Sequence, residues 1–392
     1  MDTTSAVARL LRFDHIGRAA WPASAAAWER VVDAARAAGV SGLLLERLSA
    51  SGLDAPLAAV AALRASGTAC AVDIVHAMAE LERVVGWLDR CGVPVMLLKG
   101  AALHLTIYDR PDARPMTDVD VLIRPESVSA AVRALDDFGC RRARDLVRTD
   151  FFPRYHYEID YVTPSPRPVR VDLHARAFRP LRMARTMPDD GLWHGATPVA
   201  VGASRAWVPG PEAMMIHLAA HAAFHGCARL LWLYDVNRYA DAYRDAIDWH
   251  VVADLARDWR VSLPVAVALR RATAVLGRVV PPGIIDELAS HRVTWRDRLA
   301  LAQAPRDIAS PTAHVAVNLL CTPGVRFRCG YLAAMLLPGR RHLAEVYRFR
   351  HPGWTHCARA WRLCRGVARM AALPIACIVR AVSQRAGRIA TT

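Results

Sequence analysis

The sequence predicts an α+β protein in which a small sheet unit is flanked by helical regions. Apolar residues recur at helical spacing up to residue 90 and again from Pro211 onward. Between these regions, short apolar runs are bounded by turn residues, which is typical of buried strands. The chain has 392 residues, so it can bury a sizeable core and divide into several domains.

The first region, 1–90, is rich in Ala, Leu and Arg and is expected to form helices. Ser24–Ala38 has helical spacing, and its first residue is of a type that caps helix starts. A second helix is expected over Ser41–Leu48. Val72–Cys91 is a longer amphipathic segment, and a glycine follows it directly, as at many helix ends.

The sheet unit is expected within 91–210. Its predicted strands are short apolar or alternating runs with two helices among them. The predicted strands are Pro94–Leu98, Thr117–Ile123, Tyr155–Val162 and Val169–His174. The predicted helices are Ala101–Tyr108 and Glu126–Phe138. The Pro-rich residues 163–168 are expected to join the last two strands as a hairpin.

From Pro211 the pattern is helical again, and we expect 211–304 to form a helical companion domain. Glu212–Phe224 and Ala228–Ala242 are its most strongly periodic segments. Helices at these positions would lie directly after the predicted sheet unit in the chain.

The C-terminal region 305–392 holds most of the positive charge. It has fourteen arginines and two acidic residues, a net charge of +12 out of +15 for the whole chain. Its apolar segments Tyr331–Leu337 and Val367–Val382 alternate with arginines, and Trp354 and Trp361 add aromatic surface. Three interpretations stay open: an RNA-binding surface, contact with an anionic membrane, and a solvated helical cap.

Cysteine usage and the length of apolar runs bear on location. Nine cysteines without a CxxC pair predict reduced thiols in a cytoplasmic protein. The N-terminus lacks a basic segment followed by an apolar one, so we expect no signal peptide. No apolar run reaches the roughly 18 residues that span a bilayer, so we expect no transmembrane segment.

The most informative pattern is an acidic pair inside an apolar strand. In Thr117–Ile123, alternation places Asp118 and Asp120 on one face and the valines on the other. Two adjacent carboxylates repel each other, and divalent cations relieve that repulsion. The pattern therefore predicts a site for Mg²⁺ or Mn²⁺ with a nucleoside triphosphate. The alternative is a solvated strand face.

Lys99 and Gly100 follow the preceding predicted strand. The chain has 51 Lys and Arg residues, and Lys99 is its only lysine. Coding bias explains the many arginines, so the lone lysine is a compositional hint. The one ammonium group thus stands immediately before a glycine, at the mouth of the candidate site.

A third carboxylate follows in the strand Val169–His174. Alternation places Arg170, Asp172 and His174 on the polar face of that strand. Asp172 can complete a metal site or act as general base for an attacking hydroxyl, and His174 can orient it. A cross-strand Asp–Arg pair explains this segment equally well.

These elements occur in an order that resembles a known family. The sheet unit contributes Leu98-Lys99-Gly100, Tyr108, Arg114, Asp118-x-Asp120 and Asp172-Leu173-His174. The helical region contributes His217-Leu218-x-x-His221-x-x-x-His225 and Arg229-Leu230-x-Trp232-Leu233-x-Asp235. The combination, from roughly Val72 to Ala242, resembles the uncharacterised nucleotidyltransferase family of the DNA polymerase β superfamily.

The resemblance implies a polymerase β-like nucleotidyltransferase sheet with flanking helical regions. It also implies that Asp118 and Asp120 hold the metals and that Asp172 is the third carboxylate. Gly100 would let the backbone approach a phosphate. The chain departs from the superfamily because alanine, and neither serine nor glycine, follows this glycine. We therefore expect Lys99 to contact the phosphate.

Other residues of the matched motifs are candidates for the same cleft. Arg114 lies four residues before the acidic pair, and its planar guanidinium suits a phosphate; the alternative is a solvated loop arginine. Three histidines at i, i+4 and i+8 share one helix face, with a buried structural role as their alternative. The expected lining of the cleft is His174, His217, His221, His225, Arg229 and Asp235.

The sequence thus predicts a metal-dependent nucleotidyltransferase that transfers a nucleotidyl group from an NTP to an unidentified acceptor hydroxyl, on a small molecule or peptide. The predicted catalytic and metal-binding residues are Asp118, Asp120 and Asp172, and the predicted nucleotide-binding residues are Lys99, Gly100 and Arg114. Three alternatives remain. They are an RNA-modifying or toxin-like enzyme that uses 305–392, a phosphotransferase that moves the γ-phosphate, and an inactive scaffold or membrane-surface protein.

Overall fold

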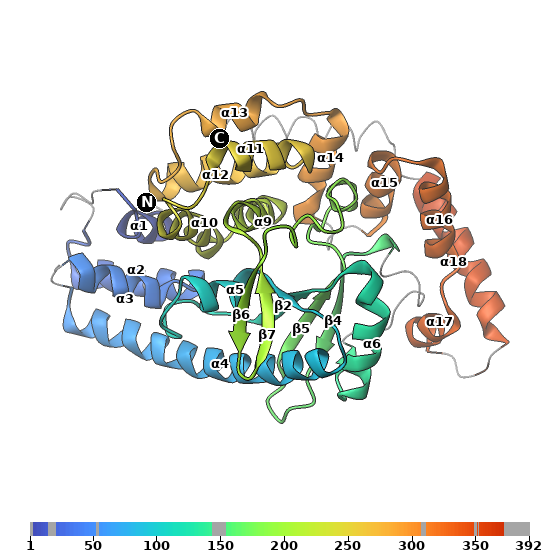
Figure 1. Cartoon of the computed structure of the whole chain (residues 1–392), viewed down its shortest axis with the longest axis horizontal. Helices are drawn as coiled ribbons and strands as arrows, with labels where there is room; N and C mark the ends of the chain where they lie inside the picture. The colour runs from blue at the N-terminus through green and yellow to red at the C-terminus, as the bar shows by residue number, and fades with distance from the viewer. Residues whose placement is uncertain are drawn as a thin grey trace.

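A seven-stranded mixed sheet lies at the centre of the protein, with helices around it (Figure 1). The structure is a computed structural model. It describes residues 3–14, 21–51, 55–142, 154–306, 311–348, 351 and 353–371. One sheet surrounded by helices confirms the predicted fold class at the level of a mixed α+β architecture.

The strands are short, and most lie where the sequence predicts them. In chain order they are β1 (Met96–Leu97), β2 (Asp118–Leu122), β3 (Arg141–Arg142), β4 (Glu158–Val162), β5 (Arg170–His174), β6 (Thr197–Val201) and β7 (Ser204–Val208). Their order across the sheet is β3-β4-β5-β2-β1-β7-β6. β2 and β5 run parallel, and β4 pairs antiparallel with β5 as the predicted hairpin.

The sequence analysis did not predict the hairpin of β6 and β7. Its strands pair antiparallel around a turn at Gly202, whose φ of +58° favours glycine. The first strand mixes small and proline residues without clear alternation, so its pattern is weak. β7 pairs parallel with β1 and thereby extends the sheet beyond the predicted strands.

The N-terminal region is helical, as predicted. Its helices are α1 (Thr3–Leu10), α2 (Ala25–Ala38), α3 (Ser41–Ser51) and α4 (Leu57–Arg90). The side chain of Ser24 caps α2 by accepting a hydrogen bond from the backbone N–H of Ala27. α4 begins well before the predicted Val72, because its first half is rich in alanine, which favours helix without giving an amphipathic pattern.

Helix α4 packs against α2, α3 and α6 (Val128–Asp137) and against β2, β6 and β7. Among the described residues it is the one helix whose length and mean hydropathy, 1.5 over 18 residues, would be enough to cross a membrane. Such a helix is weak evidence, since core helices pass the same test. Our expectation of no transmembrane segment stays a prediction.

The second helical region covers the end of the sheet where β2 and β5 finish (Figure 1). Its elements are α8 (Leu181–Ala184), α9 (Pro211–Phe224), α10 (Leu230–Ala242), α11 (Trp249–Asp258), α12 (Ser262–Leu276), α13 (Ile284–Ser290) and α14 (Trp295–Gln303). The predicted helices at Glu212–Phe224 and Ala228–Ala242 correspond to α9 and α10. One hydrophobic core runs from Val7 to Cys321, so the predicted regions pack together through shared apolar contacts.

Helices α15 (Pro311–Cys321), α16 (Val325–Leu336), α17 (Arg340–Tyr347) and α18 (Trp354–Ala371) form the described part of the basic C-terminal region. Arg182 of α8 ties this region to the body, because it bonds Asp297 Oδ1 at 2.5 Å and the carbonyl of Cys321 at 2.8 Å. The predicted apolar segment Tyr331–Leu337 lies largely within α16. Most of Val367–Val382 lies outside the described residues.

The loop between α5 (Lys99–Thr106) and β2 docks on α3 at a glycine. A Cβ added at Gly42 would lie 1.9 Å from the backbone oxygen of Asp112 and 2.8 Å from Cα of Ala113. This close approach fixes the path of the loop that leads to Arg114 and then to the acidic strand.

Replacement of Gly42 by alanine should therefore lower the free energy of unfolding by about 2 kcal/mol or more, since rigid backbone blocks the new methyl group. Gly86 in α4 is the matched control, because an added Cβ there makes only ordinary contacts of 3.5–3.6 Å. Gly86→Ala should be neutral or stabilise by up to about 1 kcal/mol through helix propensity. Urea unfolding of both variants measures the difference, and equal effects would contradict the proposed docking.

Candidate active site

Two parallel strands place the predicted carboxylates next to each other. β2 and β5 pair with Asp118 opposite Arg170 and Asp120 opposite Asp172. Paired residues of neighbouring strands point to the same face, so the three aspartates share one face of the sheet. Asp120 and Asp172 are buried, at 3% and 4% exposure, whereas Asp118 is half-buried.

Strand β4 adds two more carboxylates that the sequence analysis did not single out. Asp160 pairs with Asp172 in the sheet, and one carboxylate oxygen from each of Glu158, Asp160 and Asp172 lies within 4.8 Å of the others. The signal was present, because Glu158-Ile159-Asp160 repeats the acidic–apolar–acidic alternation of β2. Only the hairpin register shows that it joins the same face.

Arg170 partly offsets this charge. Its Nε donates to Asp172 Oδ1 at 2.8 Å, and its Nη2 lies 3.4 Å from Asp160 Oδ1. The alternative for Asp172 was a cross-strand pair with an arginine, but the arginine that bonds it belongs to the same strand. The shorter contact is made within β5, and the longer one crosses to β4.

Lys99 contributes the cation nearest to the acidic pair. It is the first residue of α5 and has a φ of +47°, an uncommon conformation for a residue other than glycine. Its Nζ donates to Asp120 Oδ1 at 2.5 Å. Burial disfavours the ammonium form, but the charge and hydrogen bond of Asp120, together with the charges of Glu158 and Asp118, outweigh burial and raise the pKa of Lys99.

The three aspartates differ in their electrostatics. Burial opposes ionisation of Asp120, but Lys99 and His174 outweigh it and hold the pKa of this carboxyl well below its usual range. Burial and the charges of Asp120 and Glu158 raise the pKa of Asp172 to about 7. Burial and Asp120 also raise the pKa of Asp118. At Asp118 and Asp172, nearby cations therefore offset burial and like charge only in part.

The histidines of the predicted cleft have different surroundings. His174 Nε2 donates to Asp120 Oδ1 at 2.8 Å, so this histidine joins the acidic site. His217 is 1% exposed, stacks on Phe178 and makes no hydrogen bond through either ring nitrogen. It does not line the cavity, which favours the structural interpretation for this residue.

His221 and His225 form an aromatic wall with Trp232. The ring centroid of Trp232 lies 4.9 Å from that of His221 and 4.8 Å from that of His225. Burial lowers the pKa of His225 to about 4 and that of His221 well below its usual value. Both rings are therefore neutral near pH 7. Arg229 stacks over Trp232, with its guanidinium carbon 5.0 Å from the ring centroid.

Arg114 is buried against the helical region instead of facing solvent. Its Nη2 donates to Asp235 Oδ2 at 2.8 Å, its Nε to Asp235 Oδ1 at 3.0 Å, and its Nη1 to the carbonyl of Pro115 at 3.1 Å. Tyr108 donates to the same carboxylate at 2.8 Å. The guanidinium predicted to contact a phosphate is thus engaged with Asp235, and the solvated-loop alternative does not describe it.

Gly100 makes room for this arrangement. A Cβ at Gly100 would lie 2.7 Å from Nη1 of Arg114 and 2.9 Å from the sulfur of Met116. The structure shows close approach at this glycine, as predicted, but the approaching group is a side chain of the protein.

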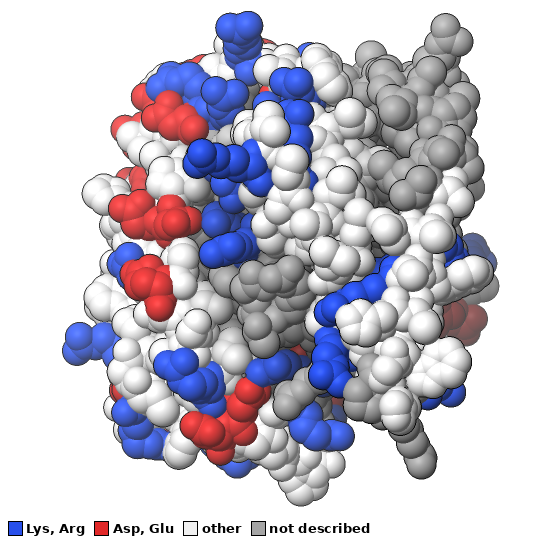
Figure 2. Space-filling view, turned by 90° about the vertical axis from the view of Figure 1, so that its right-hand side faces the viewer, with Lys and Arg blue, Asp and Glu red and all other residues white. Residues whose placement is uncertain are grey.

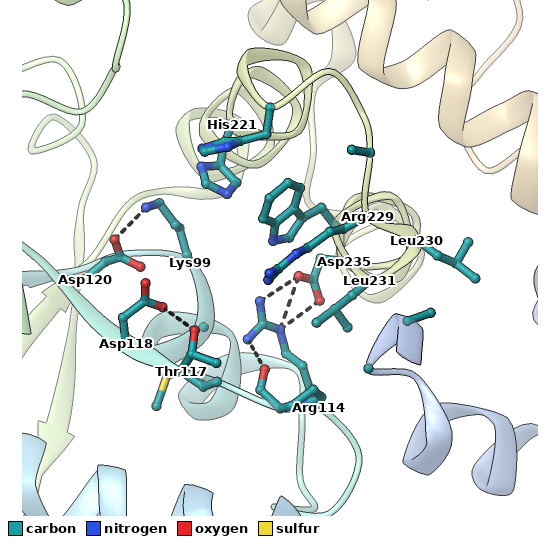
Figure 3. A pocket seen from close by; sticks show the side chains of 18 of the residues that line it. Lys99, Arg114, Thr117, Asp118, Asp120, His221, Arg229, Leu230, Leu231 and Asp235 are labelled. Atoms are coloured by element: carbon teal, nitrogen blue, oxygen red, sulfur yellow. Dashed lines mark hydrogen bonds and ion pairs between the residues drawn. The ribbon is translucent and has the colours of Figure 1, made fainter. Parts of the chain in front are cut away.

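A cavity of about 1200 Å³ brings these groups together (Figure 3). Its floor is the acidic face of β2, β4 and β5, and its opposite wall comes from α9 and the start of α10. The predicted residues that line it are Lys99, Gly100, Arg114, Asp118, Asp120, Asp172, His174, His221, His225, Arg229 and Asp235. The C-terminal end of α2 closes a further side.

The Arg114–Asp235 pair joins the two walls of the cavity, so its loss should be costly. Asp235→Ala leaves a buried guanidinium without its partner and should lower the free energy of unfolding by about 3–5 kcal/mol. Asp254→Ala, which breaks the exposed pair with Arg257, should leave the free energy of unfolding nearly unchanged, because solvent screens that pair. Denaturant unfolding compares the two. An Arg114→Met/Asp235→Leu protein should be more stable than Asp235→Ala, and an equal loss would contradict this account.

A comparison with curated proteins finds no match. Among solved structures, an antigenic nucleotidyltransferase-like protein from Paracoccidioides brasiliensis is similar, with 13% sequence identity. The match covers 52% of this chain and 97% of that protein. Its TM-score of 0.32 is too low to carry an argument. The family model for uncharacterised nucleotidyltransferases matches residues 24–277. Since this match spans more than half of the chain, the protein belongs to the uncharacterised nucleotidyltransferase family.

Proposed function

We propose that this protein is a divalent-metal-dependent nucleotidyltransferase with a polymerase β-like sheet, acting on an NTP and an acceptor hydroxyl. The observation that carries the proposal is the set of Asp118, Asp120 and Asp172 on one sheet face within a cavity of about 1200 Å³. Family membership supports the reaction class. Mg²⁺ is the first candidate for the metal, and Mn²⁺ has similar ligand preferences.

The donor set suits a hard divalent cation. Asp118, Asp120 and Asp172 offer carboxylate oxygens, and the raised pKa values of Asp118 and Asp172 reflect burial beside like charges. Such carboxylates together with phosphate oxygens are the ligands that Mg²⁺ prefers. When bound, the cation would orient the triphosphate and offset its negative charge.

The residues of the chain then have distinct roles. The acceptor oxygen would attack the α-phosphorus and form a new P–O bond, while the bond to the β-phosphate breaks and pyrophosphate leaves. Asp172 is the candidate to take the acceptor proton, since it lies beside Asp120 on the same sheet face and lines the cavity. Arg170 holds that carboxylate from within the strand. Lys99 and His174 keep Asp120 ionised as a ligand.

Metal-dependent nucleotide binding tests the proposal. With Mg²⁺, calorimetry of the native chain should show binding of at least one of the four NTPs, and a chelator should abolish it. Asp118→Asn should weaken that binding about tenfold or more, because a ligand charge is lost; a tenfold change corresponds to about 1.4 kcal/mol. Asp118 makes no ion pair among the described residues, so its replacement leaves the buried pairs of the site intact.

Asp89→Asn, at an exposed position near the end of α4, is the matched control and should bind as the native chain does. Native affinity in Asp118→Asn would contradict the assignment of the acidic face. A folded native chain that binds no NTP would overturn the proposed function.

A further inference from the structure

Arg114, Lys99 and Arg229 line the cavity, and they differ in whether their side chains are available to bind a substrate phosphate. The guanidinium of Arg114 makes its hydrogen bonds to Asp235 and to a backbone carbonyl and is 5% exposed. Lys99 holds Asp120 at 2.5 Å. Each would have to give up a buried carboxylate before it could bind a phosphate, which is costly in a low-dielectric site.

Arg229 is different. It directly precedes α10, lines the cavity and is exposed. Within the described chain it makes no ion pair with a carboxylate, and its one described contact is the stack over Trp232 at 5.0 Å. Figure 3 shows its side chain extending from α10 into the pocket, toward the side on which Lys99 and Asp118 lie.

The platform beneath Arg229 is held in place. Trp232 packs against His221 and His225 at centroid distances of 4.9 and 4.8 Å; His221 belongs to the largely buried helix α9, and His225 is the C-cap residue of that helix. A guanidinium stacked on a fixed indole keeps its edge N–H groups available, and these suit the bidentate geometry of phosphate oxygens.

We propose that Arg229, stacked on Trp232, binds the β- and γ-phosphates of the NTP. This inference rests on the proposed function. It gives the polyphosphate a cationic partner on the α10 wall, across the cavity from the acidic floor that receives the α-phosphate. It also reassigns the phosphate contact that the sequence suggested for Arg114.

A comparison of ATP with AMP tests this assignment. In calorimetry with Mg²⁺, Arg229→Gln should weaken ATP binding about tenfold, as expected for loss of a charged hydrogen-bonding partner, and should change AMP binding little. Arg133→Gln is the control, since Arg133 is an exposed arginine of α6 that does not line the cavity. It should leave both affinities as they are in the native chain. Trp232→Leu should weaken ATP binding by less than Arg229→Gln does.

The outcomes separate this inference from the proposed function. If the native chain binds ATP and Arg229→Gln binds it equally well, the assignment of Arg229 is wrong while the metal site stands. An equal loss of ATP and AMP binding would also overturn it, because the contact would then not be to the distal phosphates. A native chain that binds no ATP overturns both.

A second inference concerns the C-terminal helices and is independent of the nucleotide site. Twelve large apolar side chains are exposed among the described residues, and seven of them lie between Val325 and Leu363. Between residues 311 and 371, Glu345 is the only acidic residue. Figure 2 looks onto this side of the molecule and shows Lys and Arg side chains bordering a broad area without charged residues.

Helix α18 shows how this surface is built. Its spacing places Trp354, Cys357, Trp361 and Cys364 on one face, and all four are exposed. The opposite side docks on the protein, since Arg359 and Arg362 bond the carbonyls of Pro338 and Met335. The outward stripe is therefore mainly apolar and aromatic, and exposed Arg365 lies at its edge, four residues after Trp361. Arg340 and Arg348, at the two ends of α17, are exposed as well.

We propose that the face of α18 that carries Trp354 and Trp361 docks on an anionic lipid surface. Tryptophan rings sit favourably at the boundary of headgroups and acyl chains, and neighbouring arginines complement anionic headgroups. Single-stranded RNA favours a groove in which several cations follow the backbone beside the aromatic rings. The stripe of α18 has two tryptophans and two cysteines with one arginine at its edge, a mainly apolar face that suits a lipid interface better.

Sedimentation with lipid vesicles tests this proposal on the full chain. The native protein should bind vesicles that contain phosphatidylglycerol more strongly than vesicles of phosphatidylcholine alone. Trp354→Ser/Trp361→Ser should bind the anionic vesicles at least about fivefold more weakly, since two interfacial anchors are lost. Trp295→Ser, at a 54% exposed tryptophan of α14, should bind as the native protein does.

Undiminished binding of the double variant, or no preference of the native protein for anionic vesicles, would overturn the lipid assignment. Binding of single-stranded RNA without binding of vesicles would do so in favour of nucleic acid. Circular dichroism of each variant verifies that the exposed substitutions leave the fold intact.

Discussion

The buried ion pair between Arg114 and Asp235 is the contact on which the geometry of the site depends. It joins the loop that leads into β2 to helix α10, and these two elements form facing sides of the cavity. Because both charges are buried, the pair persists only while both partners and Tyr108 stay in place. Gly100 belongs to the same arrangement, since a side chain there would collide with the guanidinium.

This constraint divides the cavity by charge. The floor is acidic, and the single lysine of the chain, Lys99, bonds Asp120. Burial and like charges raise the pKa values of Asp118 and Asp172. The facing wall carries the aromatic cluster of Trp232, His221 and His225, the stacked Arg229, and Asp235, whose charge is paired with Arg114. One side of the cavity thus has carboxylates of raised pKa, and the other has a guanidinium without a carboxylate partner in the described chain, which is the polarity that a metal-bound polyphosphate needs.

The sequence predicted what depends on local alternation. Asp118, Asp120 and Asp172 could be placed on strand faces because a strand has a period of two residues, and the structure shows them side by side. Glu158 and Asp160 have the same pattern, but their membership of the cluster depends on hairpin register. The fate of Arg114 could not be predicted, because its partner lies 121 positions away in the chain. The hairpin of β6 and β7 was not predicted, because the sequence of β6 lacks a clear alternation of apolar and polar residues.

The high arginine content of the chain explains why the roles of individual arginines could not be assigned from the sequence. In a chain with one lysine and fifty arginines, composition cannot distinguish a buried structural guanidinium from one that waits for a ligand. Burial and partners make the distinction. Arg114 and Arg182 are buried and hold carboxylates, whereas Arg229 lies on an aromatic ring at the cavity without a carboxylate partner in the described chain. An arginine kept on a rigid aromatic surface loses little side-chain entropy on binding, which favours it as the phosphate contact.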